Sequence, residues 1–308
     1  MNTFFFELAV SVESPFTGRI SPCGNSSAAW FLGFCLTPEC LLTLRLWLRV
    51  PTTPSQHCLS PDLEAWSIPK EIIDKAPESP WIHPPALFQI PKLIDLTPSH
   101  QKAFEALPAN GSILDIGCGG GIAAFAMGKK AGLVIGVDHQ VEMLEMFSEN
   151  AKERHIDSKV YEGFWPEIES KVEVADVAVA HHVVYNVQEI VPFIKAMNSH
   201  ARKRVVIEMP QHHPLSNLSE AWKYFWKLDR PENPTPQDFM DVLLELGING
   251  HMQLWDGQLR QERNLNDAVR FTRIRLCLPE SREPEVRDFL VNHPASEIRP
   301  LATIWWDL

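Results

Sequence analysis

The sequence predicts an α/β protein built on a doubly wound, mostly parallel sheet with helices on both faces. Short apolar runs typical of buried strands alternate with helical stretches along most of the chain. The run Ile113–Ile116 ends in a glycine cluster at 117–121, and a second run, Leu133–Val137, ends in Asp138. Sheets of this class bind nucleotides at a glycine turn after one strand and at an acid that ends the next.

The elements around these two strands follow from caps and apolar spacing. Thr97 or Ser99 can cap a helix through Ala106. The stretch Ile122–Lys130 is rich in alanine, so we expect a helix that begins at the glycines and directs its N-terminal dipole at a ligand. Further elements of the parallel part are expected as helices at His139–Arg154 and Glu189–Met197 and as strands at Lys159–Tyr161, Asp176–Ala180 and Arg204–Met209.

The carboxyl-terminal third continues the alternation. An aromatic and apolar stripe from Leu218 to Trp226 has helical spacing. Thr235 and Pro236 form an N-cap and a first helical position, and Gly247 stops that helix after Leu246. The remaining elements are expected as strands at His251–Trp255 and Leu301–Trp306 and as helices at Leu265–Leu276 and Ser281–Asn292.

The spacing of the glycines separates two kinds of cofactor. A dinucleotide fingerprint needs G-x-G-x-x-G, so that helix and strand pack closely beside a pyrophosphate. Here Ile122 follows Gly121, and the pattern from Asp115 onward is D-x-G-x-G-x-G. This spacing disfavours NAD or FAD and leaves a different nucleotide ligand.

On this pattern the chain resembles the class I S-adenosylmethionine-dependent methyltransferases. The resemblance implies a Rossmann-like, seven-stranded sheet with one antiparallel edge strand, and it implies S-adenosyl-L-methionine as the cofactor. In that family the glycine turn lies against the methionyl part of the cofactor, and the acid after the second strand holds the ribose. The matching residues here are Asp115, Gly117, Cys118, Gly119 and Gly121 in the turn and Asp138 as the ribose acid. Cys118 is expected to be a small structural residue rather than a nucleophile.

The resemblance extends the cofactor site to two further loops. His139 and Met143 begin the helix after Asp138, near the expected adenosine, with core packing as the alternative for Met143. The loop after the third strand borders the adenine ring in the family, so Gly163, Phe164 and Trp165 are candidates there, with plain packing as the alternative for the aromatic pair. The list of expected cofactor contacts closes with His181.

The fourth strand ends in the most chemically loaded segment, His181-His182-Val183-Val184-Tyr185-Asn186. Because histidine titrates near neutral pH, His182 can take a proton from an attacking O–H or N–H group, and Tyr185 is the second catalytic candidate. Asn186 is expected to contact the substrate. Two more substrate candidates, His212 and Trp226, follow the fifth strand. Structural packing is the alternative for each of these side chains.

The charge and the motifs of the sequence limit the kinds of partner that the protein is expected to bind. The formal net charge of −11 opposes unaided binding to nucleic-acid phosphates. The fourth strand also lacks the Asn/Asp-Pro-Pro-aromatic motif of methyltransferases that modify base amines or glutamine amides, and there is no Pro-Cys pair like that of cytosine-C5 enzymes. We therefore expect a small-molecule acceptor, no nucleic acid and no membrane partner. No cysteine or carboxylate cluster has ligand spacing, so no metal is expected either.

The cysteines indicate the cellular compartment, and the amino-terminal segment indicates how many domains the chain has. Six cysteines without a C-x-x-C pair favour a reducing, cytoplasmic compartment. Residues 1–60 contain no lysine and only six charged side chains, and we expect a poorly ordered or loosely attached extension there. A genuine extension and an upstream misreading of the start codon both stay open. Residues 61–308 are expected to form one domain, with an N-terminal cap at 61–110, a cofactor-binding core at 111–210 and substrate-side helices and final strands at 211–308.

The predicted function is transfer of a methyl group from S-adenosylmethionine to an oxygen or nitrogen nucleophile by in-line displacement. Two alternatives stay open on the sequence. One is an NAD(P)-dependent oxidoreductase on a related sheet, and the other is a protein that binds S-adenosylmethionine without catalysis.

Overall fold

The structure, a computed structural model, describes residues 67–80, 90–258, 264–294, 296 and 298–308. All of these residues belong to one compact unit of the chain, Arg45–Leu308. The predicted extension at 1–60 and parts of the predicted N-terminal cap, residues 61–66 and 81–89, lie outside the described residues. The domain boundary near residue 60 therefore stays a prediction.

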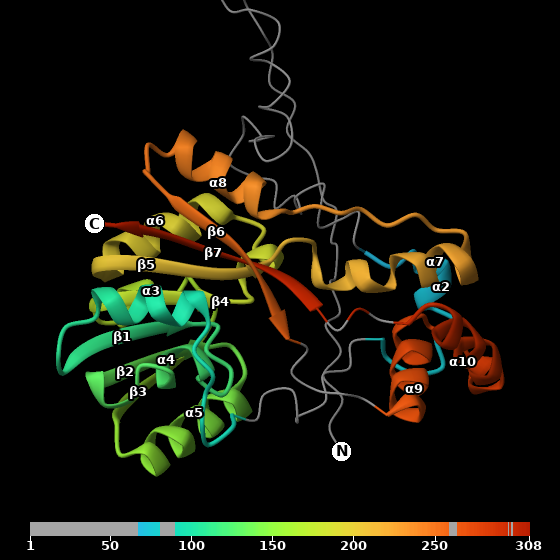
Figure 1. The fold of residues 1–308 in the computed structure, drawn as a ribbon, viewed down its shortest axis with the longest axis horizontal. Coiled ribbons are helices and arrows are strands. Elements are labelled where there is room, and N and C mark those ends of the chain that lie inside the picture. The colour runs from blue at the N-terminus through green and yellow to red at the C-terminus, as the bar shows by residue number, and fades with distance from the viewer. Residues whose placement is uncertain (1–66, 81–89, 259–263, 295, 297) are drawn as a thin grey trace, which may run out of the picture. The chain divides into compact units, whose positions relative to one another are not determined.

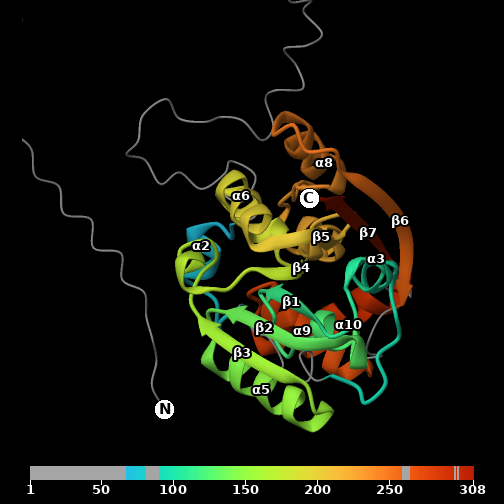
Figure 2. The same ribbon diagram turned by 90° about the vertical axis from the view of Figure 1, so that its left-hand side faces the viewer.

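A seven-stranded sheet organises the described part of the chain (Figures 1 and 2). Its strands are β1 (Gly111–Ile116), β2 (Ala131–Asp138), β3 (Asp157–Glu162), β4 (Ala175–His181), β5 (Ala201–Pro210), β6 (His251–Gln258) and β7 (Ile298–Asp307). They lie in the order β3-β2-β1-β4-β5-β7-β6. The first five strands pair in parallel, and β7 is antiparallel to both of its neighbours, β5 and β6. The predicted mixed, mostly parallel sheet is confirmed, with its antiparallel strand one place in from the edge.

Alternating apolar residues give the sheet two buried faces. In β4, Val177 and Val179 pack in one hydrophobic cluster, whereas Ala178 and Ala180 pack in the other. The first cluster is covered by α3 (Pro98–Ala106), α4 (Ile122–Phe125) and α5 (Val141–Arg154). The second is covered by α6 (Ile190–His200) and α8 (Pro236–Glu245), which lie on the opposite side of the sheet in Figure 2. Helices on both faces are the arrangement that a parallel sheet requires.

The order of the strands creates a switch point beside β1. Its neighbours β2 and β4 run parallel to it and lie on opposite sides, so the chain turns in opposite directions after β1 and after β3. Open α/β sheets bind ligands outside the carboxyl ends of the strands at such a point. The glycine turn and the histidine-rich segment after β4 both lie at these ends.

Four helices outside the sheet share a hydrophobic cluster of their own. They are α2 (Lys70–Ile73), α7 (Ser219–Trp226), α9 (Leu265–Arg275) and α10 (Glu283–Asn292). Trp222, Val269 and Phe289 are buried among them. The buried guanidinium of Arg273 in α9 forms ion pairs with Glu78 and Glu283, which connects this helix to α10 and to the segment after α2.

The helix expected at Ile122–Lys130 is shorter than predicted. α4 ends at Phe125, and a separate 3-10 turn covers Gly128–Lys130. Gly128 has a φ of 53°, in the left-handed region, which cannot continue an α-helix. The expectation that a long helix directs its dipole at the ligand is therefore wrong, because a four-residue helix has little dipole to offer.

Candidate active site

The glycine turn after β1 is built so that only glycine fits at two of its positions. Gly117 and Gly121 have φ values of 67° and 93°. A Cβ on Gly117 would lie 2.5 Å from Cγ2 of Val183, and one on Gly121 would lie 2.3 Å from Cε2 of Phe125. The loop after β4 thus packs directly against the turn after β1, as the predicted site requires.

The N–H groups of the turn hold it against β2. Gly117 and Cys118 both donate to the carbonyl of Val137, at 2.8 and 3.0 Å. Gly119 donates to Oδ2 of Asp138 at 3.0 Å. These three donors are engaged within the protein. The turn therefore contributes a closely packed backbone surface to the site, and it offers few N–H donors to an anionic ligand.

Two carboxyl groups, those of Asp115 and Asp138, lie close to the turn. Asp115 is 2% exposed, and its carboxylate accepts a hydrogen bond from the N–H of Ala124 at 3.2 Å. Burial raises the pKa of Asp115 well above its usual range, the Ala124 bond opposes this, and the charge of Asp138 adds to it. Burial and both aspartates likewise raise the pKa of the Cys118 thiol. Cys118 is therefore a protonated, buried thiol and not a nucleophile at neutral pH. A cationic ligand suits this potential, and a pyrophosphate does not.

Asp138 and an exposed aromatic side chain, Phe164, lie near one another at the end of β2. Oδ1 of Asp138 accepts from the N–H of Gln140 at 3.0 Å, and the residue is 8% exposed. Gly163 donates its N–H to the Asp138 carbonyl at 2.9 Å, which fixes the loop after β3 at this point. In that loop, Phe164 is 58% exposed and stacks on His139 with ring centroids 4.7 Å apart. Each carboxylate oxygen accepts more than one hydrogen bond, so ribose hydroxyls beside Asp138 and a planar base against Phe164 both fit.

Two of the predicted cofactor contacts lie mainly in the protein interior. The indole of Trp165 donates to the carbonyl of Phe193 at 3.4 Å and meets His200 edge-on, on the α6 face of the sheet. Met143 is 9% exposed and counts among the buried residues of α5. Both side chains therefore occupy the positions expected from the alternative prediction, in which they pack in the protein interior.

A buried carboxylate that sequence reasoning missed lies at the centre of the histidine-rich segment. Glu208 in β5 is 1% exposed and lies opposite His181 of β4 in the sheet register. Nε2 of His182 donates to its Oε1 at 3.0 Å, and Nδ1 of His181 lies 4.0 Å from its Oε2. Thr97, the N-cap of α3, donates its hydroxyl to the same Oε2 at 2.9 Å. An acid in the otherwise apolar run Val205–Met209 was the signal that could have identified Glu208.

We call this group the acid–histidine cluster, and it consists of Thr97, His100, His181, His182 and Glu208. Its histidines affect both its geometry and the charge of Glu208. The rings of His100 and His181 lie 5.3 Å apart, and Thr97 and His100 form the capping box of α3. Burial alone would raise the pKa of Glu208, but its attraction to His181, the His182 bond and the charge of His100 hold it well below its usual range. His182 has a φ of 62°, a conformation that costs energy for a non-glycine residue and tends to occur at functional sites.

The other predicted catalytic and substrate residues occupy different positions. Tyr185 packs edge-on against the buried His213, with centroids 5.5 Å apart, and burial raises the pKa of its phenol to about 12 against the opposing charge of Arg299. Tyr185 is thus protonated at neutral pH and cannot act as a base there. Asn186 and His212 are exposed, whereas Trp226 donates to the carbonyl of Leu276 at 2.7 Å in the helical cluster of α7 and α9.

Comparison with known proteins identifies the domain that contains the glycine turn and Asp138. Residues 113–204, from β1 into β5, match the family model described as a methyltransferase domain. The chain contains a methyltransferase domain. The predictions of a class I methyltransferase fold, of a methyltransferase enzyme and of S-adenosyl-L-methionine as its cofactor are thereby confirmed.

The other comparisons add little. No curated protein matches the chain. Among solved structures, the YcgJ protein from Bacillus subtilis is 16% identical, with a TM-score of 0.49 over 68% of this chain and 97% of its own. A putative methyltransferase from Bacillus halodurans is 14% identical (TM-score 0.45, 68% and 95% covered), and a SAM-dependent methyltransferase from Archaeoglobus fulgidus is 16% identical (TM-score 0.42, 68% and 90% covered). At such identities and TM-scores, no conclusion about this methyltransferase follows from them.

Two searches of the described residues bear on partners. No helix in this part of the methyltransferase is long and apolar enough to cross a membrane. Within the same part, no group of three histidine, cysteine or carboxylate side chains is arranged to hold a metal ion.

Proposed function

We propose that this methyltransferase transfers the methyl group of S-adenosylmethionine to a hydroxyl or amino group of a small molecule, and that His182 takes the proton of that group. The observation that carries this proposal is the 3.0 Å hydrogen bond between Nε2 of His182 and the buried Glu208. An acid that orients a histidine and stabilises its protonated form is the arrangement of a general base.

Each part of the site has a role in this proposal. S-adenosylmethionine supplies a methyl group on a sulfonium, which is a good leaving group. The charge of Asp138 provides the negative potential that favours a cationic ligand, and Asp138 is also the acceptor for the ribose. Phe164 provides an exposed aromatic face for the adenine. Methyl transfer then needs mainly alignment of the acceptor, plus removal of its proton by His182.

The same geometry argues against the oxidoreductase alternative. A dinucleotide pyrophosphate is bound by turn N–H groups and by the N-terminus of the following helix. Here Gly117, Cys118 and Gly119 donate within the protein, and α4 has only four residues. The carboxylate of Asp138 at the turn would also repel the phosphates.

Calorimetric binding tests the cofactor half of the proposal. S-adenosylmethionine, S-adenosylhomocysteine and NADH are titrated into the protein and into an Asp138→Ala variant. We expect micromolar affinity for the first two ligands, because the site offers a ribose acid and an adenine face, and a loss of about tenfold or more in the variant. Binding of NADH alone would contradict the proposal.

Turnover tests the proton-transfer half. Methyl transfer from labelled S-adenosylmethionine is measured with a panel of small hydroxyl and amino acceptors, using wild type, His182→Gln and His155→Gln. His155 is a matched control, because it is exposed and also adopts a left-handed φ, of 55°. We expect His182→Gln to lower the rate by about 10²- to 10⁴-fold with S-adenosylhomocysteine affinity unchanged. Equal rates in the two variants would remove His182 from the mechanism, and cofactor binding without turnover on any acceptor would favour the non-catalytic alternative.

A further inference from the structure

The hydroxyl of Thr97 makes two hydrogen bonds, one within α3 and one to the acid of the acid–histidine cluster. Its oxygen accepts the N–H of His100 at 3.3 Å, which caps the first turn of α3. Its proton is donated to Oε2 of Glu208 at 2.9 Å, although the two residues are 111 positions apart in the sequence. Thr97 is thus a point at which a helix on the face of the sheet reaches the buried acid.

A second N-cap threonine shows that capping does not require such a distant acceptor. Thr235 caps α8 with the same kind of capping box and with a proline at the next position, as in α3. Its hydroxyl donates to Oδ2 of Asp238, in its own helix, at 2.7 Å. In α3 the corresponding residue is His100, whose Nδ1 accepts the backbone N–H of Thr97 at 3.1 Å. The hydroxyl proton of Thr97 is therefore directed away from its own helix and onto Glu208.

We propose that Thr97 is a positioning residue for proton transfer, which holds the carboxylate of Glu208 in the orientation that His182 needs. The inference rests on the proposed function, since it concerns the same base. The last torsion of a glutamate side chain has a broad minimum, so a single hydrogen bond leaves the carboxylate plane loosely fixed. Here Oε1 accepts from Nε2 of His182 at 3.0 Å and Oε2 accepts from Thr97 at 2.9 Å, so both oxygens are held.

The surroundings of Glu208 make the Thr97 hydroxyl hard to replace. Glu208 is 1% exposed, so little water can reach Oε2 if the hydroxyl is removed. Nδ1 of His181 lies 4.0 Å from the same oxygen. Without Thr97, the carboxylate would turn toward His181, and Oε1 would move away from His182. The backbone N–H of His182, which donates to the carbonyl of Glu208 at 2.7 Å, would keep the two residues together while their side chains lose alignment.

The N-terminus of α3 is itself held in place by buried contacts. The hydroxyls of Ser99 and Thr303 share a hydrogen bond of 2.6 Å, and both residues are fully buried. Trp255 of β6 donates its indole N–H to the same hydroxyl of Thr303 at 3.0 Å. Ala103 packs in the hydrophobic cluster on this face of the sheet. A donor can orient its partner only where its own position is fixed by packing and further hydrogen bonds, and Thr97 meets this condition.

Imidazole NMR on the full chain, with isotope-labelled histidine, tests the inference without any methyl acceptor. The Nε2 proton of His182 is identified by its absence in His182→Gln and is followed through its rate of exchange with water. We expect this exchange to be about ten- to hundredfold faster in Thr97→Val, because the loosened carboxylate holds the proton less firmly. Thr97→Ser keeps a hydroxyl at this position and should restore the slow exchange of wild type.

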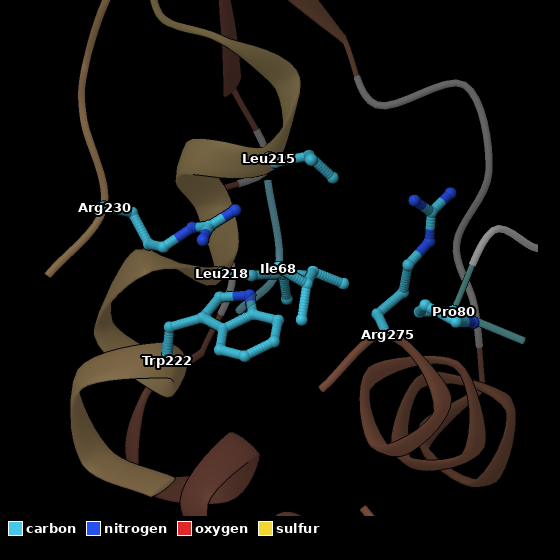
Figure 3. Close-up of a pocket in the computed structure, with 7 residues that line it drawn as sticks. All are labelled: Ile68, Pro80, Leu215, Leu218, Trp222, Arg230 and Arg275. Carbon is cyan, nitrogen blue, oxygen red and sulfur yellow. The ribbon is translucent and has the colours of Figure 1, made fainter. Parts of the chain in front are cut away.

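Two control variants separate positioning from loss of stability. Thr235→Val removes the equivalent cap from α8. Leu218→Ala removes buried apolar contacts elsewhere. Figure 3 shows Leu218 among the residues that line a hollow beside α7 and α9, and none of the described lining residues belongs to the acid–histidine cluster. Both controls should lower the unfolding temperature and keep the wild-type exchange rate.

Turnover gives a second measurement with any acceptor that wild type methylates. Thr97→Val should lower kcat about ten- to hundredfold, because the hydroxyl acts through Glu208 on the base. Its affinity for S-adenosylhomocysteine, measured by calorimetry, should equal that of wild type. Thr235→Val should keep both kcat and affinity.

The inference is overturned if wild type shows no protected Nε2 proton, if exchange or kcat in Thr97→Val equals that of wild type, if Thr97→Ser does not restore slow exchange, or if Thr235→Val loses as much protection. Circular dichroism checks that each variant folds. Where Thr97→Val does not fold, Thr97→Gly replaces it, because glycine caps a helix nearly as well as threonine but has no hydroxyl. The two proposals fail in different ways. Absence of methyl transfer on every acceptor would leave the NMR result intact, whereas unchanged exchange in Thr97→Val would leave cofactor binding and wild-type turnover intact.

Discussion

Replacing Gly117 by alanine tests whether the contact between the glycine turn and the loop after β4 holds the site together. The residue has a φ of 67°, which costs an alanine about 1–2 kcal/mol. The new Cβ would also lie 2.5 Å from Cγ2 of Val183, a short branched side chain that cannot move aside without a change of rotamer or backbone. Such overpacking costs a further ~1–3 kcal/mol. The expected loss is therefore about 2–5 kcal/mol of unfolding free energy.

Gly128→Ala is the matched control for this variant. Gly128 has a similar φ of 53°, but a Cβ there would meet nothing within 4 Å. Its expected cost is about 1–2 kcal/mol, so the difference between the two variants isolates the Val183 contact at about 1–3 kcal/mol. Urea denaturation of both variants gives these free energies, provided that the slopes agree with wild type.

Ligand affinity and turnover provide a second measurement of the effect of Gly117→Ala. Val183 follows His182 directly, so displacing the valine would also displace the histidine from Glu208. We expect Gly117→Ala to lose affinity for S-adenosylhomocysteine and to lose turnover, while Gly128→Ala keeps both. If Gly117→Ala were as stable and as active as Gly128→Ala, the close packing of the turn against Val183 would not govern the site.

Three further outcomes follow from the described contacts. Glu208→Gln should lower kcat about 10- to 100-fold by removing the charge that stabilises protonated His182, and the acid limb of the pH–rate profile should move to lower pH; an unmoved limb would mean a purely structural role. His213 is protonated below pH 6.5 in the unfolded chain but only near pH 4 in the fold, so unfolding takes up a proton between these values. Stability should fall by up to about 3 kcal/mol as the pH drops from 6.5 to 4, and urea titrations of a His213→Gln variant should show a correspondingly smaller fall. Thr235→Ala should cost about 1 kcal/mol by removing the capping box of α8, and a thermal melt beside the variant Ser170→Ala, at an exposed residue outside α8, provides the comparison.

The parallel sheet was predictable because its strands carry continuous apolar runs between clear helical stripes. The run Ile113–Ile116 and the acid Asp138 fall at β1 and at the end of β2, as expected. The capping helices at Thr97 and Thr235 also follow their sequence signals. Local chemistry decides these features, so a single sequence contains enough information for them.

Contacts between distant segments could not be predicted in the same way. The pairing of Glu208 with His182, and its bond from Thr97, depends on the register of β4 and β5 and on where α3 docks. The aromatic pair Phe164 and Trp165 was ambiguous because neighbouring side chains in a loop can point in opposite directions. In the structure Phe164 stacks on His139, whereas Trp165 packs on the α6 face.

The attachment of α3 to the sheet determines how far the site extends along the chain. Thr97 bonds to the buried carboxylate of Glu208 in β5, and Ser99 bonds to Thr303 of β7 at 2.6 Å, so α3 is attached to two neighbouring strands that are distant from it in sequence. The family match at 113–204 includes the glycine turn and Asp138 but stops short of Glu208 and begins after Thr97. A fragment trimmed to that match would keep the glycine turn and Asp138, which we propose hold the methyl donor, and would lose Thr97 and Glu208, which we propose orient the base. On the proposed roles, the donor side of the site lies within the family match, whereas the acceptor side depends on segments outside it.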